Sequence, residues 1–181
     1  AGSRIPAGAS HPTGYGVRDP GDAGSGAADG RRCGGRYGAA GLLGTSPGQG
    51  VLLQHRVGWS HFGGTWGIPG GARRHGESAV DAALRESAEE AGVPADALVV
   101  CGSHVLDLGF WSYVTVFARA RRPFTPRRCD DESLELRWGP PEKVPEYTLH
   151  PEFGRSWPTV RREFADALRQ RGLDPAPFLG R

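Results

Sequence analysis

Residues 71–93 read GARRHGESAVDAALRESAEEAGV, a segment that leaves a glycine-rich loop and continues as one helix. From Glu77 to Ala91 it contains neither Gly nor Pro, and its apolar residues recur at spacings of three and four. That periodicity predicts a helix with one buried side. The apolar residues on that side are Val80, Leu84, Ala88 and Ala91. Gly92 then provides the residue type that most often ends a helix.

Three carboxylates share one face of this expected helix. Glu86, Glu89 and Glu90 stand at positions i, i+3 and i+4, and residues so spaced are neighbours on a helix surface. Like charges at this spacing repel one another and destabilise the helix. A divalent cation with a preference for oxygen ligands, such as Mg²⁺ or Mn²⁺, would make the same arrangement stabilising. The alternative is a solvent-exposed acidic face with Arg85 as its counter-charge. The three glutamates alone leave both interpretations open.

The residues around these carboxylates follow a fixed spacing. From Gly71 to Val93 the sequence fits the pattern G-x5-E-x7-R-E-U-x-E-E-x-G-U, in which U is apolar and x is any residue. At ~7% usage per residue, its seven fixed identities arise by chance at ~10⁻⁸ per starting position. Ser87 is the one departure, because the pattern has an apolar residue there. The segment resembles the Nudix box, the motif of the MutT-like Nudix hydrolase family.

The resemblance implies a fold and a metal site. The expected fold is α/β (α+β), a Nudix-type α/β/α sandwich with a mixed curved sheet. The expected cofactor is Mg²⁺, for which Mn²⁺ can substitute. Its ligands would be the carbonyl of Gly71 and the side chains of Glu86, Glu89 and Glu90. A glycine suits this place, since it lets the backbone approach a metal or a phosphate without a Cβ in the way.

The resemblance also implies a reaction, the attack of water on a phosphorus of a P–O–P bridge. The water needs a base, and two glutamates are candidates: Glu86 in the box, and Glu132 at the end of the acidic run that begins at Asp130. Glu135 is a second choice beyond that run. The alternative is that the run is only a solvent-exposed turn. Arg85 completes the expected catalytic set, where it would hold the glutamates or Glu77 in place.

The substrate is less well defined by the sequence. We expect a nucleoside diphosphate linked to another group, above all a nucleoside triphosphate, oxidised ones included. Candidate substrate-binding residues are Arg56, Trp66, Phe110 and Trp111, although aromatic residues in strands more often belong to a core. Two other functions stay open: a Nudix-fold sensor that binds a nucleotide without cleaving it, and an RNA-processing protein of the decapping type.

The rest of the chain predicts strands, short helices and two tails. Residues 39–57 are expected to form a hairpin, residues 63–71 an irregular loop, and residues 121–131 a polar loop. Further expected elements are strands at residues 98–108, 110–120 and 134–138, a short helix from Pro140 and a helix over residues 158–169. We expect a flexible Gly/Pro/Ala-rich tail over residues 1–35, one domain over 36–172 and a C-terminal tail over 173–181.

Composition limits the expected partners. The net charge of +2 in 181 residues gives no strong basic field, so nucleic acid is not an expected partner. The three cysteines are Cys33, Cys101 and Cys129, and without a C-x-x-C pair they predict a reducing, cytoplasmic location. No apolar run is long enough to span a membrane. We expect a monomer or a homodimer that takes a nucleotide as its small-molecule substrate.

Overall fold

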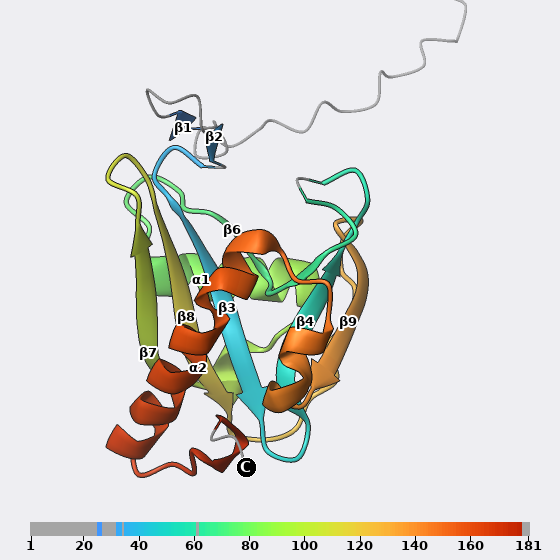
Figure 1. Cartoon of the computed structure of the whole chain (residues 1–181), viewed down its shortest axis with the longest axis vertical. Coiled ribbons are helices and arrows are strands. Elements are labelled where there is room, and N and C mark those ends of the chain that lie inside the picture. The colour runs from blue at the N-terminus through green and yellow to red at the C-terminus, as the bar shows by residue number, and fades with distance from the viewer. Residues whose placement is uncertain (1–24, 27–31, 34, 61, 179–181) are drawn as a thin grey trace, which may run out of the picture.

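The computed structural model describes residues 25–26, 32–33, 35–60 and 62–178, and its centre is a seven-stranded sheet (Figure 1). The strands run β5-β4-β3-β8-β7, with β6 also paired to β3 and β9 to β4. Their bounds are β3 Ala39–Ser46, β4 Gly50–Arg56, β5 Trp66–Gly67, β6 Gly70–Ala72, β7 Leu98–Asp107, β8 Ser112–Ala120 and β9 Ser133–Gly139. The strands β3 and β8 are parallel and the other pairs are antiparallel, which confirms the expected mixed sheet.

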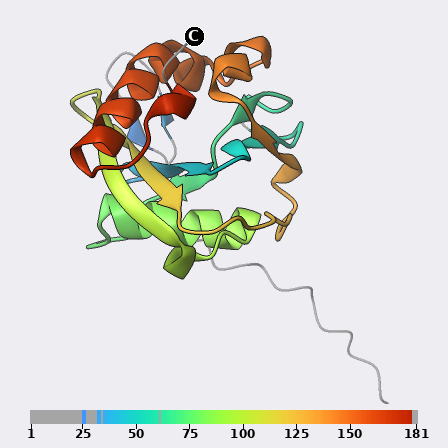
Figure 2. The same cartoon turned by 90° about the horizontal axis from the view of Figure 1, so that it is seen from below.

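Two helices cover opposite faces of this sheet, as Figure 2 shows. Helix α1, Ala79–Ala91, packs against β3 and β6, and helix α2, Pro151–Gln170, packs against β7. Each face has its own apolar core. The α1 side includes Leu42, Leu52 and Ala83, and the α2 side includes Leu43, Phe117 and Phe164. The α/β/α sandwich expected from the sequence is therefore confirmed.

Helix α1 begins and ends at residues suited to those positions. The hydroxyl of Ser78 accepts a hydrogen bond from the Asp81 N–H at 3.0 Å, so the helix starts just after Glu77 rather than at it. At the other end Gly92 has φ of 61°, and its N–H donates to the carbonyl of Ala88. Ser87, the departure from the motif, is fully buried and donates its hydroxyl proton to the carbonyl of Leu84. A small hydroxyl residue thus fits at this helix position.

Helix α2 corrects the sequence-based prediction, because it begins at Pro151 and not at residue 158. Pro151 occupies the first turn, where its missing N–H costs nothing, and His150 caps the helix by accepting from the Glu152 N–H. Pro158 lies inside the helix. The sequence analysis took Pro158 for a start, since proline is much more common there than in a helix interior.

The glycine-rich loop over residues 63–71 also differs from expectation, since it contributes two short strands. β5 pairs with β4, and β6 pairs with β3. The second pairing requires Gly70, where a Cβ would lie 2.5 Å from both the carbonyl oxygen of Ala40 and the Cα of Gly41. The close approach of two backbones, which only glycine permits, makes a strand out of a segment with little strand propensity.

The described residues also contain the short 3₁₀ helices η2 Ala95–Ala97, η3 Pro141–Glu146 and η4 Ala176–Phe178. Phe178 is buried and packs on Phe164, so residues 173–178 of the expected C-terminal tail lie against the domain. Within the expected N-terminal tail, β1 Ser25–Gly26 pairs with β2 Arg32–Cys33. Residues 1–24, 27–31, 34, 61 and 179–181 lie outside the described residues, so the tail over 1–35 stays a prediction. Among the described residues, no helix has the length and apolar character needed to cross a membrane.

Candidate active site

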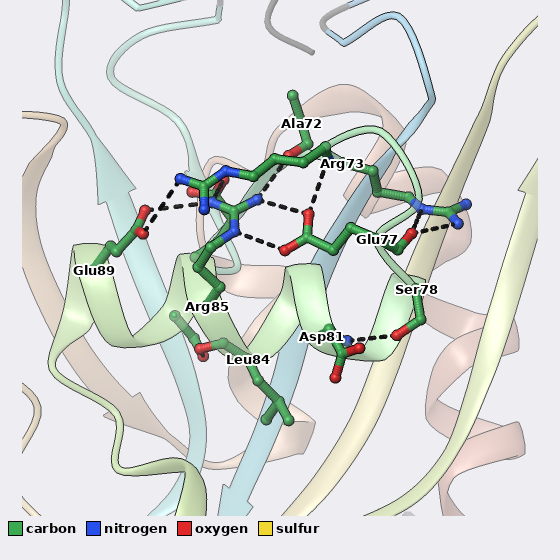
Figure 3. Close-up of polar contacts among 11 residues, drawn as sticks. Ala72, Arg73, Glu77, Ser78, Asp81, Leu84, Arg85 and Glu89 are labelled. Atoms are coloured by element: carbon green, nitrogen blue, oxygen red, sulfur yellow. Dashed lines mark hydrogen bonds and ion pairs between the residues drawn. The ribbon is translucent and has the colours of Figure 1, made fainter. Parts of the chain in front are cut away.

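Arg85 connects the loop before α1, through Glu77, to the last turn of the helix, through Glu89 (Figure 3). Its guanidinium donates to both carboxylate oxygens of Glu77, at 2.8 and 3.0 Å, and to the carbonyl of Ala72 at 3.0 Å. Nη1 donates to Glu86 at 2.6 Å and reaches Glu89 at 3.3 Å. The hydrogen bonds from Arg85 hold the pKa of Glu77 below its ordinary value. Arg85 thus lies between Glu77 and two glutamates of α1.

The three glutamates of α1 have different surroundings. Glu86 is partly buried, and a Cβ added at Gly71 would lie only 2.6 Å from its carboxyl carbon. Burial raises the pKa of Glu86, against the lowering effect of its hydrogen bond from Arg85. Glu89, by contrast, is exposed and lies 4.0 Å from Arg74 in addition to its contact with Arg85. The helix periodicity put all three on one face, but only Glu86 and Glu90 are shielded from solvent.

Glu90 is the most deeply buried acid of the site, with 4% of its surface exposed. Its Oε2 accepts from the side-chain amide of Gln54 at 3.0 Å and from the N–H of Gly70 at 3.1 Å. Burial, together with the nearby charge of Glu86, raises the pKa of Glu90 to about 8. A carboxylate in this position is costly for the protein to keep ionised without a cation beside it.

The loop before β9 brings two more acids to Glu90. Backbone hydrogen bonds fix this loop to the end of α1, from Arg127 N–H to the Ala91 carbonyl at 2.9 Å and from Cys129 N–H to the Glu90 carbonyl at 3.1 Å. Further on, the carbonyl of Glu132 accepts from the N–H of Val57 at 2.9 Å. One carboxylate oxygen from each of Glu90, Asp130 and Glu132 lies within 4.8 Å of the others. The structure therefore brings the carboxylate of Glu132 close to Glu90 of the box, and its expected role as the base stays a prediction.

This donor set suits a hard divalent cation. Carboxylate oxygens from a helix and a loop, with a backbone approach at Gly71, are the ligand types that Mg²⁺ and Mn²⁺ accept. Burial is the largest cause of the raised pKa values of Glu86 and Glu90, and a bound cation would favour the ionised form of both. The residues present fit the expected ion, with Glu90, Asp130 and Glu132 as the grouped side chains and Glu86 as a nearby charge.

Two of the four candidate substrate-binding residues lie along β4 and its neighbour β5. Burial raises the pKa of the Tyr113 hydroxyl, and Glu90 raises it further while Arg56 lowers it, so Arg56 lies within electrostatic reach of the site. Trp66 stacks on His55 with ring centroids 4.5 Å apart and planes at 5°, and Arg137 lies 5.3 Å from its ring centroid. Trp66 is thus already packed in an aromatic cluster of the protein itself.

Phe110 and Trp111 lie in the turn between β7 and β8. The indole N–H of Trp111 donates to the carbonyl of Gly35 at 3.0 Å, and its ring lies 6.2 Å from that of Tyr113. This gives Trp111 a structural contact with the start of the domain. Phe110 is partly buried in the same turn.

The sequence analysis missed three residues that the structure brings to the site, Gln54, Asp130 and Ser133. Ser133 accepts from the amide of Gln54 at 2.7 Å, and both side chains are buried. Gln54 carried a usable signal, a polar residue that directly follows the apolar run Val51–Leu53 in a strand. Asp130 stood in the acidic run but could not be ranked above its neighbours. Ser133 carried no signal in the sequence.

Comparison with known proteins agrees with this geometry. The family model of the NUDIX domain matches residues 35–161. The chain is 42% identical to the crystal structure of a Nudix hydrolase from M. smegmatis, RenU, with a TM-score of 0.74 over 81% of this chain and 96% of that one.

Two relatives from other bacteria are longer than the matched region. The chain is 47% identical over 139 residues to "Putative 8-oxo-dGTP diphosphatase 3" of Mycobacterium tuberculosis, which covers 70% of this chain and 63% of that protein. It is 44% identical over 150 residues to the "Nucleoside triphosphate pyrophosphatase/Nudix hydrolase fusion protein" of Bifidobacterium longum, which covers 78% of this chain and 31% of that protein. The matching family model, the sandwich fold and the box geometry together show that this chain belongs to the Nudix family.

Proposed function

We propose that this chain is a Mg²⁺-dependent pyrophosphohydrolase that cleaves a P–O–P bond in a nucleoside diphosphate linked to another group. The observation that supports it most is the group of Glu90, Asp130 and Glu132, whose carboxylate oxygens lie within 4.8 Å of one another. Such a group is destabilising unless something offsets its charge, and one of its members, Glu90, belongs to the box of a hydrolase family. Mn²⁺ would substitute, because the ligands are oxygen atoms.

The chemistry assigned to the residues follows from their positions. A water oxygen bonds to phosphorus, the bridging P–O bond breaks, and the proton of the water passes to a carboxylate. Glu132 and Glu86 are the two candidate bases, since both lie close to Glu90 and are more accessible than it. The cation, when bound, would neutralise charge on the phosphates. Arg85 is a positioning residue, since its guanidinium is bound to Glu77, Glu86 and the Ala72 carbonyl.

For the substrate we propose a nucleoside triphosphate, with oxidised guanine nucleotides as the first to test. The support is a resemblance in sequence, 47% identity to a relative that carries the name of an 8-oxo-dGTP diphosphatase. Cleavage between the α- and β-phosphates would release pyrophosphate, and cleavage between the β- and γ-phosphates would release phosphate. The product therefore identifies the bond that breaks.

The experiment is a panel of nucleotides incubated with the full chain and Mg²⁺, followed by separate assays for phosphate and pyrophosphate. Chromatography of the nucleotide products detects turnover of ADP-ribose and of the dinucleoside polyphosphate, whose cleavage need release neither of these ions. The panel contains dGTP, 8-oxo-dGTP, the other nucleoside triphosphates, ADP-ribose and a dinucleoside polyphosphate. We expect turnover of at least one compound, abolished by a chelator and restored by added Mg²⁺. Binding without turnover throughout the panel would reject the proposal in favour of a nucleotide sensor. Turnover that survives complete chelation would reject the metal.

A further inference from the structure

The side-chain amide of Gln54 connects the two halves of the acidic site. It lies on β4, buried to 2% exposure, and its Nε2 donates to Glu90 Oε2 at 3.0 Å and to Ser133 Oγ at 2.7 Å. Glu90 belongs to helix α1, and Ser133 is the first residue of β9, directly after Glu132. The NH₂ group of Gln54 therefore donates one hydrogen to Glu90 on the helix and the other to Ser133 at the end of the loop.

Two donors hold the same carboxylate oxygen of Glu90. Both the Gln54 amide and the N–H of Gly70 donate to Oε2, so Oε1 is the oxygen that these two donors leave for another ligand. The same amide fixes the distance from Glu90 to the backbone at Ser133, and hence to the adjoining carboxylate of Glu132. The two donor hydrogens of a planar amide hold their acceptors at a set angle and distance.

The core itself gives no reason for an amide at this place. The residues before Gln54 on β4 are Val51, Leu52 and Leu53, all buried in apolar clusters. A leucine of similar size would continue that packing without the cost of removing an amide from water. The two hydrogen bonds offset this cost, and both acceptors lie at the acidic site.

We propose that Gln54 is a positioning residue, whose amide holds Glu90 and the loop of Asp130 and Glu132 at the separation that a divalent cation requires. The inference rests on the proposed function, since it assumes that these acids bind such an ion. Groups that orient metal ligands typically change metal affinity or activity by 10–100-fold when they are replaced.

The test is a titration of the full chain with Mn²⁺ in the absence of nucleotide, followed by electron paramagnetic resonance of the free ion. We expect Gln54→Leu to weaken Mn²⁺ binding by about 10-fold. In kinetics on the preferred nucleotide, the variant should lose kcat at limiting Mn²⁺ and regain most of it in excess Mn²⁺, with KM for the nucleotide near the wild-type value. The matched control is Gln49→Leu. Gln49 lies in the β3–β4 turn, where it accepts from Ser46 and donates to the carbonyl of Phe124, and this variant should bind Mn²⁺ as the wild type does.

Ser133→Ala tests the connection separately and serves if Gln54→Leu does not fold. It leaves the bond from Gln54 to Glu90 but releases the amide from β9, so Mn²⁺ affinity should again fall. The double variant should bind Mn²⁺ no more weakly than Gln54→Leu alone, because both changes break one connection. Losses that add, or wild-type affinity in either single variant, would overturn the inference.

These outcomes are distinguishable from failure of the proposed function. Equal Mn²⁺ affinity in the wild type and Gln54→Leu would reject the role of Gln54 while nucleotide hydrolysis still stands. A wild type that binds Mn²⁺ through Gln54 but turns over no nucleotide would reject the hydrolase and keep the inference. A shift in melting temperature with unchanged Mn²⁺ affinity would show that Gln54 only stabilises the fold. A wild type that binds no Mn²⁺ would reject both.

Discussion

Gly70 and Gly71 are adjacent, but a Cβ would meet different neighbours at each of them. A substitution at one position therefore tests packing, and a substitution at the other tests the placement of Glu86. In Gly71→Ala the new Cβ would lie 2.6 Å from the carboxyl carbon of Glu86, so the carboxylate must move. We expect kcat to fall by up to about 10²-fold, as a displacement of about 1 Å in a catalytic group can cause, with little change in stability. In Gly70→Ala the Cβ would meet the backbone of β3 at 2.5 Å, which a strand cannot easily relieve.

Gly70→Ala is therefore the matched comparison for Gly71→Ala. We expect it to lower the free energy of unfolding by about 1–3 kcal/mol, as overpacking usually does. Urea unfolding and steady-state kinetics on both variants provide the measurement. If Gly71→Ala unfolds as readily as Gly70→Ala and keeps wild-type kcat, Glu86 has no catalytic role at this place.

A second residue prediction concerns the base. Glu132→Gln should reduce kcat by about 10²-fold or more, with substrate affinity near wild type and loss of the acidic limb of the pH–rate profile. Asp131→Asn, a change of the same kind one position earlier, should behave as the wild type, since Asp131 is exposed and outside the close acidic group. Kinetics across a pH series measure both. If Glu86→Gln shows the larger loss of kcat at saturating Mg²⁺, Glu86 is the base instead.

The candidate site was predictable to the extent that its residues are close in sequence. The motif spacing identified Glu86, Glu90 and Arg85, because a helix converts spacing directly into position. It could not show that Glu89 is exposed while Glu90 is buried, since that difference depends on where β4 and β6 lie against α1. Gln54 and Ser133 meet only because β4 pairs with β9, a contact across 79 positions that no local pattern encodes.

At the level of elements, the end of α1 also positions the loop that carries Asp130 and Glu132. Gly92 has φ of 61°, and a Cβ there would lie 3.3 Å from the Cys129 sulfur, so Gly92→Ala adds both backbone strain and a loop contact. We expect a loss of stability of about 1–2 kcal/mol from the left-handed conformation alone. Displacement of the loop should also lower Mg²⁺-dependent activity.

Gly172→Ala is the matched control for this effect. Gly172 follows helix α2 with φ of 66°, and a Cβ there would meet nothing within 4 Å. It should show a similar loss of stability, measured by urea unfolding, with full activity per folded molecule. Equal activity in the two variants would mean that the end of α1 does not position the loop.

Helices and strands differed in how well the sequence defined them. The bounds of α1 were nearly correct, because an N-cap serine and a C-terminal glycine stand at its ends. The predicted start of α2 was wrong, because Pro158 was taken as the first residue of a helix that begins at Pro151, with His150 as its cap. The pairing of β3 with β8 in parallel joins residues far apart in the chain, and alternation within each strand says nothing about it.

At the scale of the whole molecule, the raised pKa of Glu90 predicts how stability depends on pH and on metal. Glu90 has an ordinary value of 4.5 and a folded value of about 8, so between these limits the folded protein holds a proton that the unfolded chain has released. Its contribution to stability is complete below about 4.5 and disappears as the pH rises through about 8. Glu86 shifts in the same direction, and Glu77 in the opposite direction, with its effect below 4.5.

We therefore expect the melting temperature of the metal-free protein to fall between about pH 6 and about pH 8.5. Mg²⁺ should raise the melting temperature more at the higher pH, because there the ion need not displace a proton from Glu90. Differential scanning fluorimetry at both pH values, with a chelator or with Mg²⁺, measures this. Glu90→Gln is the control, since its neutral amide should remove most of the fall and most of the Mg²⁺ effect. The fall in melting temperature from about pH 6 to about pH 8.5 is compared between the metal-free wild type and Glu90→Gln. If the fall is no larger in the wild type, Glu90 is ionised in the folded protein without help from a cation.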